Sequence, residues 1–426
     1  MIDVVDCIFL AISQRLIFDE SHCSYVQMTT ATKYDLRKDA VVRVATDILN
    51  KKGVHGMTVA LVAAELGLGP RAVGYYFRRK EDLAIACYRR SIDRMDDHIT
   101  TALKKSRASE ILRTFVHVFF EAQRQVLLGE MEPIAWFEDM RTVHDPETGE
   151  AFTRVFKKVR SLFEGSDLPT FERKERNARA HLLLSQMFWA VLWLPRYNPE
   201  DYGRLAERTA DILLNGMTGA PVAWLPPPLP LGDDEETGPA FLKAGTELIN
   251  EQGYLGASVT KISARLKLTK GSFYHHNETK DELVQQCFER TWEILQRAQQ
   301  AADKTTTSGL ANLAAQAVAM VGGQVSGKRP LLRTSALAAV PEEMRPRLLA
   351  GFDRITARYA SVISDGIGDG SIRPLDVTVA AQILSGTINA AAELCYWAPG
   401  LTPDTAEMYY VRPMFTGLLK RTAASL

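Results

Sequence analysis

Residues 40–87 read AVVRVATDILNKKGVHGMTVALVAAELGLGPRAVGYYFRRKEDLAIAC, and residues 240–287 read AFLKAGTELINEQGYLGASVTKISARLKLTKGSFYHHNETKDELVQQC. The two segments align without a gap at a shift of 200 residues, with glycines, alanines and leucines at matching positions. Far downstream, the Trp-Leu-Pro of residues 193–195 recurs as the Trp-Ala-Pro of residues 397–399. The chain of 426 residues therefore contains the same unit twice, as a tandem duplication does.

Each copy opens with the pattern of three short helices. In copy 1, apolar residues at helical spacing stop at Gly53, Thr58 is placed to cap a second helix, and Pro70 leads a third. Copy 2 repeats the pattern, with Ser258 and Thr269 as the capping residues. A short helix, a tight turn and a second short helix are typical of a helix-turn-helix, whose second helix fits the major groove of DNA.

At these residues the chain resembles the TetR family, in which a recognition helix closing in Tyr-x-Phe is followed by Lys-Glu-x-Leu. Copy 1 supplies YYF at residues 75–77 and KEDL at residues 80–83, and copy 2 supplies KGSFYHH at residues 270–276 and KDEL at residues 280–283. The resemblance implies an all-α fold of two tandem units. Each unit would have a three-helix DNA-binding domain and a helical regulatory domain, and the two units would form an intramolecular pseudo-dimer.

The repeat also sets the expected domain boundaries. Between the copies lies a segment rich in proline and acidic residues, which favours an extended and solvated linker. At about 3.1 Å per residue it reaches roughly 55 Å, enough to place the copies side by side. The expected domains are an N-terminal tail (1–34), a first DNA-binding head (35–82), a first regulatory domain (83–218), the linker (219–236), a second head (237–282) and a second regulatory domain (283–426). Residues 1–27 lack the repeat pattern, which leaves Met28 open as an alternative translation start.

The charge of the whole chain does not itself indicate a nucleic-acid partner. Lysine plus arginine and aspartate plus glutamate each number 51, so the formal net charge is zero. Affinity for DNA must then come from a local basic face. Residues 37–90 hold 11 basic against 5 acidic side chains, and residues 237–290 hold 7 against 6. We expect the first head to supply more of the attraction to phosphate.

Several other classes of protein are disfavoured by the sequence. The five cysteines are scattered without a CxxC spacing, which is typical of a reducing compartment, and neither a signal peptide nor a membrane-spanning run is present. We therefore expect a cytoplasmic protein. No P-loop, GxSxG, HExxH, Rossmann fingerprint or metal-spaced Cys/His cluster occurs, so we expect neither an enzyme nor a cofactor or metal.

The resemblance assigns DNA contacts residue by residue in both heads. Thr58 and Ser258 would offer a helix N-terminus to phosphate, and other residues would touch phosphates or base edges. The residues assigned to DNA are Thr58, Arg71, Ala72, Tyr75, Tyr76 and Lys80 in the first head, and Ser258, Thr269, Lys270, Ser272, His275, His276 and Lys280 in the second head. The alternative for a basic residue on a helix is an ordinary solvated position, and Val73, Phe77 and Phe273 are interpreted as core.

The last helices of each unit form the dimer interface in the TetR family, and the middle helices enclose an effector pocket. Here the segments 181–193 and 380–397 are apolar nearly all round, as expected of helices buried on both sides. They can pair within the chain, which gives a single-chain pseudo-dimer. The alternative is pairing between chains, which gives a dimer with four heads.

A set of bulky aromatic residues in copy 1 is the candidate ligand site, with ordinary core packing as the alternative. These residues are Phe115, Phe119, Phe120, Trp136, Phe188 and Trp189. We expect a double-stranded DNA operator and a small apolar or amphipathic effector as partners, with repression as the mode of regulation. The alternative function is a helical binding or scaffold protein that has lost DNA reading. It is suggested by Gly74, where the family has an aromatic residue, and by Asn277, where the family has Phe.

Overall fold

The computed structural model describes residues 30–137, 140, 143–219, 224–232, 240–265 and 279–420. All regular elements in these ranges are helices, and the β structure there is limited to an isolated antiparallel bridge between Thr218 and Ile372. The fold class is therefore all-α, as expected. Within the same ranges, each helix is too short or too polar to cross a membrane.

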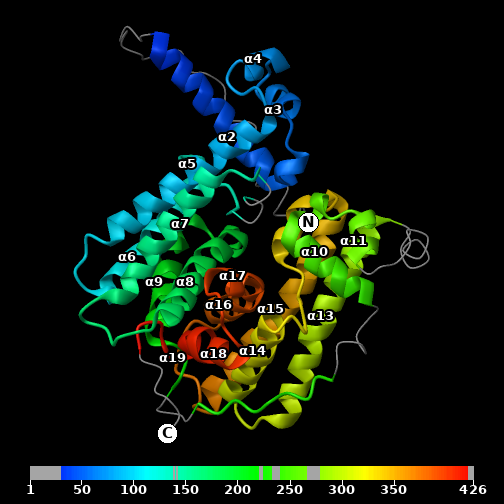
Figure 1. The fold of residues 1–426 in the computed structure, drawn as a ribbon. Coiled ribbons are helices and arrows are strands. Elements are labelled where there is room, and N and C mark those ends of the chain that lie inside the picture. The colour runs from blue at the N-terminus through cyan, green and yellow to red at the C-terminus, as the bar shows by residue number, and fades with distance from the viewer. Residues whose placement is uncertain are drawn as a thin grey trace.

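The first half of the structure comprises residues 30–219, and Figure 1 shows its first three helices projecting from the body of the molecule. Its α-helices are α2 (Thr30–Gly56), α3 (Val59–Glu65), α4 (Pro70–Gly74), α5 (Lys80–Ala102), α6 (Ala108–Leu127), α7 (Pro146–Ser161), α8 (Arg173–Trp193) and α9 (Tyr202–Asn215). Short 3-10 turns follow α7 and α8 and precede α9, at Leu162–Glu164, Leu194–Arg196 and Pro199–Asp201.

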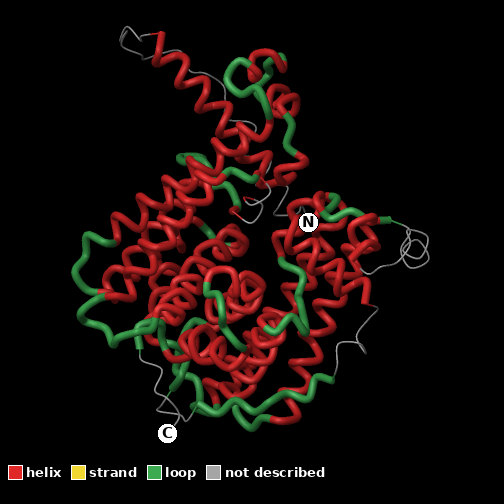
Figure 2. The backbone as a smooth tube through the Cα atoms, in the orientation of Figure 1, coloured by secondary structure: helices red, strands yellow, loops and turns green. Residues whose placement is uncertain are grey.

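The second half comprises residues 240–420 and repeats this order with more interruptions. Its helices, like those of the first half, are joined by loops (Figure 2). Its α-helices are α10 (Ala240–Gly256), α11 (Val259–Arg265), α13 (Lys280–Thr305), α14 (Gly309–Val325), α15 (Arg345–Gly368), α16 (Val377–Ala390), α17 (Leu394–Trp397), α18 (Pro403–Ala406) and α19 (Arg412–Thr416). Its 3-10 turns are Thr334–Ala339, Glu342–Met344 and Ala391–Glu393, and Glu407–Val411 forms a π-helical turn. The apolar run 380–397 is thus divided between α16, a 3-10 turn and α17.

The first helix of each half bends at a glycine that the repeat preserves. Gly53 has φ of 66° and Gly253 has φ of 70°, a left-handed conformation that glycine adopts without steric cost. After each bend the chain makes a further helical turn, which ends at Gly56 in α2 and at Gly256 in α10. The sequence placed the end of the helix at the bend itself, so the helical segment is one turn longer than expected.

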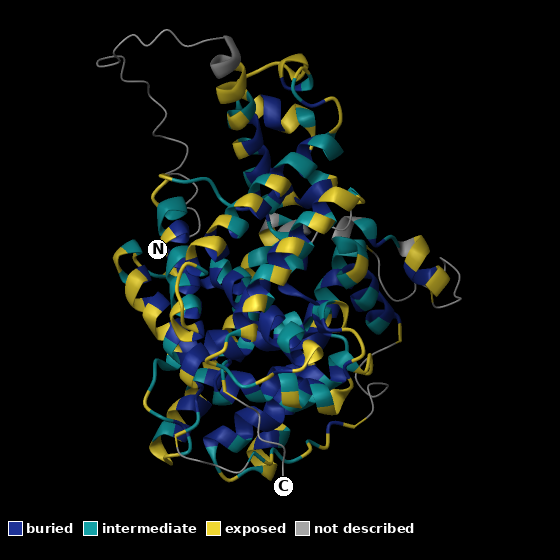
Figure 3. Cartoon of the chain, turned by 60° about the vertical axis from the view of Figure 1, so that its left-hand side comes forward, coloured by how far each residue is buried: buried dark blue, intermediate teal, exposed yellow. Residues whose placement is uncertain are grey.

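The last helices of the two halves pack on each other. Helix α8 lies against α16 and the π-helical turn, and α9 lies against α16 and α19. The side chain of Gln186 donates to Thr387 Oγ1 at 3.0 Å, and the indole of Trp189 donates to Gln382 Oε1 at 3.1 Å. Buried residues of both halves form one continuous core, with exposed residues on the outer faces of the helices (Figure 3). The first head has a separate core of its own.

Part of the connection between the halves packs on the second half. The indole of Trp224 donates to Glu407 Oε1 at 2.9 Å, and its ring lies 5.3 Å from that of Phe415. Leu231 is 7% exposed. Residues 224–232 are therefore solvated only in part: Trp224 and Leu231 are packed, whereas Leu225 is 78% exposed. The acidic residues 233–236 lie outside the described residues.

Candidate DNA-binding surface and ligand cavity

The first head contains the expected helix-turn-helix. Thr58 caps α3, and its hydroxyl accepts a hydrogen bond from the backbone N–H of Leu61 at 3.2 Å. The turn passes through Gly67, whose φ is 65°, and Pro70 occupies the first turn of α4. Val62 and Val73, one from each helix, are completely buried in the core of the first head.

Helix α4 turns its assigned DNA residues to solvent. Arg71 and Ala72 are exposed, and Tyr75 is 74% exposed, whereas Phe77 is 7% exposed and belongs to the core. Tyr76 is half-buried. The surface next to Val73 therefore carries a guanidinium, a methyl group and a phenol, the kinds of group that contact base edges and phosphates in a groove.

Tyr34 on α2 extends this surface and was not found from the sequence. Its ring centroid lies 4.9 Å from that of Tyr76 and 6.0 Å from that of Tyr75. The rings of Tyr75 and Tyr76 are 5.3 Å apart and nearly perpendicular. The spacing of 41 residues between Tyr34 and Tyr75 gave no local signal, because the contact exists only after α2 and α4 have packed.

Lys80 has a structural contact in addition to any contact with DNA. It is the first residue of α5, and its Nζ donates to the carbonyl oxygen of His55 at 3.2 Å. A basic group at the C-terminal end of a helix satisfies a carbonyl that has no partner within the helix. In the second head, Lys261 Nζ donates to the carbonyl oxygen of Gly256, the last residue of α10, at 3.0 Å.

The second head is described only in part. Ser258 caps α11, with its Oγ accepting from the backbone N–H of Lys261 at 3.3 Å. Burial, and to a lesser extent the charge of Lys261, lowers the pKa of Lys280 to about 8. The remaining residues assigned to DNA in this head lie outside the described residues: Thr269, Lys270, Ser272, His275 and His276.

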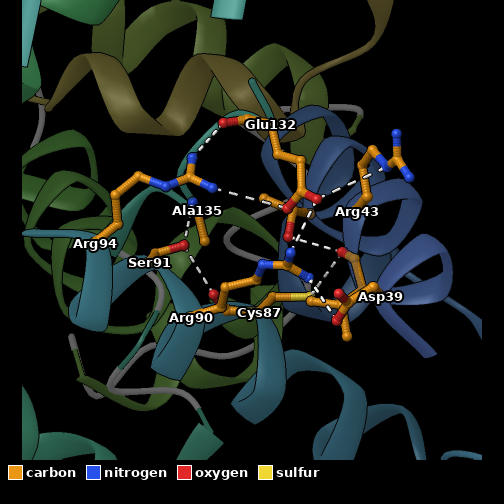
Figure 4. A network of polar contacts seen from close by, with 10 residues as sticks. Asp39, Arg43, Cys87, Arg90, Ser91, Arg94, Glu132 and Ala135 are labelled. Carbon is orange, nitrogen blue, oxygen red and sulfur yellow. Dashed lines mark hydrogen bonds and ion pairs between the residues drawn. The ribbon is translucent and has the colours of Figure 1, made fainter. Parts of the chain in front are cut away.

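A polar network joins the first head to the body around Glu132 (Figure 4). The Glu132 carboxylate pairs with Arg90 at 3.0 Å and with Arg43 and Arg94 at 3.8 Å each. Arg90 also pairs with Asp39 at 3.2 Å. Some of the basic side chains counted in the first head are therefore directed toward carboxylates at this joint, and the count of charges overstates the part that faces DNA.

A cavity lies between the two halves and is lined by residues of both. Three of the aromatic residues named from the sequence line it, namely Trp136, Phe188 and Trp189. The other three, Phe115, Phe119 and Phe120, are 0% exposed and belong to the packed core of the first half. The candidate set is thus divided between the cavity wall and the core behind it.

Both halves supply cavity residues that sequence reasoning missed. Trp397 stacks on Phe156 of the first half, with ring centroids 4.5 Å apart, and both line the cavity. Arg333 and Glu393 also line it and form an ion pair at 2.9 Å. The repeat drew attention to Trp397, but only the packing of α8 on α16 brings these residues to one cavity. No cluster of His, Cys, Asp and Glu suited to a metal occurs in the part of the chain that the structure describes.

Comparisons with known proteins agree with the repeat. The family model of the bacterial regulatory proteins, tetR family, matches residues 41–87 and again residues 241–287. A curated relative is the HTH-type transcriptional repressor DhaR from Mycobacterium sp. (strain GP1), which is 28% identical over 142 residues, covering 31% of this chain and 68% of the relative.

Two solved structures of similar chains each cover less than half of this one. The TetR family transcriptional regulator PfmR from Thermus thermophilus is 18% identical, with a TM-score of 0.34, and covers 42% of this chain and 99% of its own. AibR in complex with isovaleryl coenzyme A and operator DNA is 21% identical, with a TM-score of 0.34, and covers 42% of this chain and 97% of its own.

Proposed function

This chain is a tandem member of the TetR family of bacterial regulatory proteins, and we propose that it is a transcriptional repressor that binds an operator through two heads of one polypeptide. The observation that carries the proposal is the surface of α4, where Arg71, Ala72 and Tyr75 are exposed beside the completely buried Val73. Such a regulator acts where the bacterial chromosome lies, in the cytoplasm.

The roles proposed in the first head follow the geometry of α3 and α4, and those in the second head follow the repeat. Arg71, Ala72 and Tyr75 read base edges in the major groove, while Thr58, Tyr76 and Lys80 hold the phosphate backbone. In the second head Lys270, Ser272 and His275 have the base-reading role, and Ser258, Thr269, His276 and Lys280 the phosphate role.

One chain replaces the usual pair of subunits in this proposal. The contacts of α8 and α9 with α16 and α19 support it, because they join the last helices of the two halves within one polypeptide. Tethering raises the effective concentration of one half around the other, which favours this pairing over pairing between chains. The two heads then address two half-sites about one DNA turn apart, roughly 34 to 36 Å.

The effector is a small apolar or amphipathic molecule that binds in the cavity between the halves. The aromatic wall that includes Trp136, Phe188 and Trp189 supports this assignment. Binding of the effector lowers the affinity for DNA, with a coupling free energy of about 1 to 3 kcal/mol, equivalent to roughly 5- to 150-fold weaker binding.

Selection of binding sites from random DNA, followed by gel shift at fixed salt, tests the proposal. Arg71→Ala is expected to weaken binding to the selected site by about 1 to 3 kcal/mol and to relax its sequence preference. Arg204→Ala in α9, which removes the same charge from an exposed position paired with Asp201, is the control and should bind as the unmodified chain does. A chain that selects no sequence would instead be a helical ligand-binding or scaffold protein, the alternative suggested by Gly74 and Asn277.

A further inference from the structure

Both halves form the walls of the cavity, and hydrogen bonds join the two halves there. From α8, His181 makes a hydrogen bond to the carbonyl oxygen of Ala390 at 3.0 Å, and both residues line the cavity. Trp189, also on α8 and lining the cavity, donates to Gln382 of α16. A molecule in this cavity therefore touches the first and second halves together.

One wall of the cavity is held by the first helix of the first head. Trp136 lines the cavity, and its backbone N–H donates to Asn50 Oδ1 at 2.9 Å. Asn50 Nδ2 in turn donates to the carbonyl oxygen of Ile134 at 2.8 Å. Asn50 lies on α2, just before the bend at Gly53. The carboxamide of Asn50 thus connects the first head to Trp136, a residue that lines the cavity.

The opposite half repeats this arrangement with equivalent residues. Arg333 lines the same cavity, and its backbone N–H donates to Asn250 Oδ1 at 3.1 Å. Asn250 Nδ2 donates to the carbonyl oxygen of Leu331 at 2.8 Å. Asn250 lies on α10 at the position that corresponds to Asn50 in the repeat.

A second pair of repeated contacts holds the same two wall segments. The backbone N–H of Ala135 donates to Ser91 Oγ at 2.8 Å, as Figure 4 shows, and that of Leu332 donates to Thr291 Oγ1 at 2.9 Å. Ser91 lies on α5 and Thr291 on α13, the helices that directly follow the two heads. Each wall segment is therefore fixed between the first helix of a head and the helix after it.

From this geometry we infer that the cavity is a single effector site, filled by one molecule per chain, that controls both heads through the carboxamides of Asn50 and Asn250. The inference rests on the proposed function, since it takes the heads to read DNA. A carboxamide that both donates to and accepts from one backbone segment moves with that segment, because breaking the pair leaves polar groups unsatisfied at about 1 to 3 kcal/mol each. Displacement of Trp136 and Arg333 by one ligand thus reaches α2 and α10 together.

The walls specify the chemistry of the ligand. The apolar part is aromatic, with Phe152, Phe188 and Trp397 among its residues. The polar part has the hydroxyl of Ser185, the carboxamide of Asn389 and the ion pair of Arg333 with Glu393, whose charges cancel. An uncharged amphipathic molecule with a flat apolar body and one or two hydrogen-bonding groups fits this combination.

Titration of the full chain with the uncharged dye N-phenylnaphthylamine tests the site. The dye should bind at one molecule per chain, and Ser335→Trp from the second half and Val191→Trp from the first half should each abolish binding, because both positions line the cavity. Ser364→Trp, at an exposed position of α15, is the control and should leave binding unchanged. No dye binding, or binding that survives either cavity substitution, would overturn the shared site.

Hydrogen exchange without DNA tests the coupling. Binding of one dye molecule should change hydrogen exchange both in residues 48–57 and in residues 248–257. Asn50→Leu should abolish the change in residues 48–57 only. Asn250→Leu should abolish the change in residues 248–257 only. Asn50→Asp and Asn250→Asp, which keep the acceptor and lose the donor, serve if a leucine variant does not fold. The inference would be overturned if only one head responded to the dye. It would also be overturned if a head still responded after its own asparagine had been replaced. Failure to bind DNA would instead count against the proposed function, because this readout contains no DNA.

Discussion

The guanidinium Nη2 of Arg345 donates a hydrogen bond to the carbonyl oxygen of Lys51 at 3.0 Å. Arg345 begins α15 in the second half, whereas Lys51 lies on α2 in the first head. The contact satisfies a carbonyl next to the bend at Gly53, where the helical hydrogen-bond pattern is interrupted. The first head is therefore supported by the regulatory part of the second half as well as by its own.

Replacing Arg345 by Met should loosen the first head without unfolding the body. The variant keeps the aliphatic stem and removes the donor to Lys51, so we expect a loss of about 1 kcal/mol in the free energy of local opening. Hydrogen exchange in residues 48–57 is the measurement, and it should become faster. Arg347→Met is the control, because Arg347 is exposed and pairs with Glu289 on the body. Equal hydrogen exchange in the two variants would show that the contact to Lys51 does not stabilise the first head.

The stability of the second head should depend on the ionisation of Lys280. Folding lowers the pKa of this group from its ordinary 10.5 to about 8, so the folded state disfavours the charged form. The free-energy cost of burying the charged ammonium group is complete below about pH 8 and disappears as the pH rises to about 10.5. The stability of the unmodified chain relative to Lys280→Met should therefore rise across that window. Urea denaturation at a series of pH values measures this difference. Removing the neighbouring charge with Lys261→Met should move its onset to higher pH, and a difference that is flat with pH would contradict the assignment.

The operator should be asymmetric, and the first head should dominate its affinity. The two recognition segments carry different side chains, so they read different bases. Lys80→Met should weaken binding more than Lys280→Met and should reduce the slope of log affinity against log salt by about 1. Lys52→Met, at an exposed position of α2 to which no DNA role is assigned, should leave binding unchanged. A selected site with perfect inverted symmetry, or equal losses from the two lysine variants, would contradict this prediction.

The close packing of α8 on α16 requires glycine at position 386. A Cβ atom there would lie 2.8 Å from Cγ of Trp189 and 3.0 Å from Oε1 of Gln186, closer than side chains approach. Gly386→Ala should therefore lower the free energy of unfolding by about 1 to 3 kcal/mol. Gly203→Ala in α9, where a Cβ meets nothing within 4 Å, should leave it unchanged or raise it by up to about 1 kcal/mol. Denaturant unfolding compares the two, and an equally stable Gly386→Ala would show that this interface is not tightly packed.

The helices of the first head could be predicted from sequence because their signals are local. Thr58 and Pro70 mark helix starts, and Gly53 adopts the left-handed conformation that its position indicated. The same reasoning found Trp136 and Trp189 as candidate ligand residues, since large aromatics are conspicuous in any sequence. These features depend on residues close together in the chain.

The cavity and its connections to the heads could not be predicted, because they depend on contacts between distant segments. Phe119 and Phe188 are equally aromatic, yet only the packing of the second half leaves one in the core and the other on the cavity wall. Asn50 and Asn250 occupy equivalent positions of the repeat. Their role at the joint became visible only once the partners of their carboxamides, which lie more than 80 residues away, were known.

If one chain does the work of two subunits, it should stay monomeric both alone and bound to a selected operator, and light scattering measures this. We expect a free particle of 47.4 kDa and a complex with one chain per operator, because α8 and α9 pair with α16 and α19 inside the chain. An obligate species of two chains, free or on DNA, would mean that these helices pair between molecules and would contradict the claim.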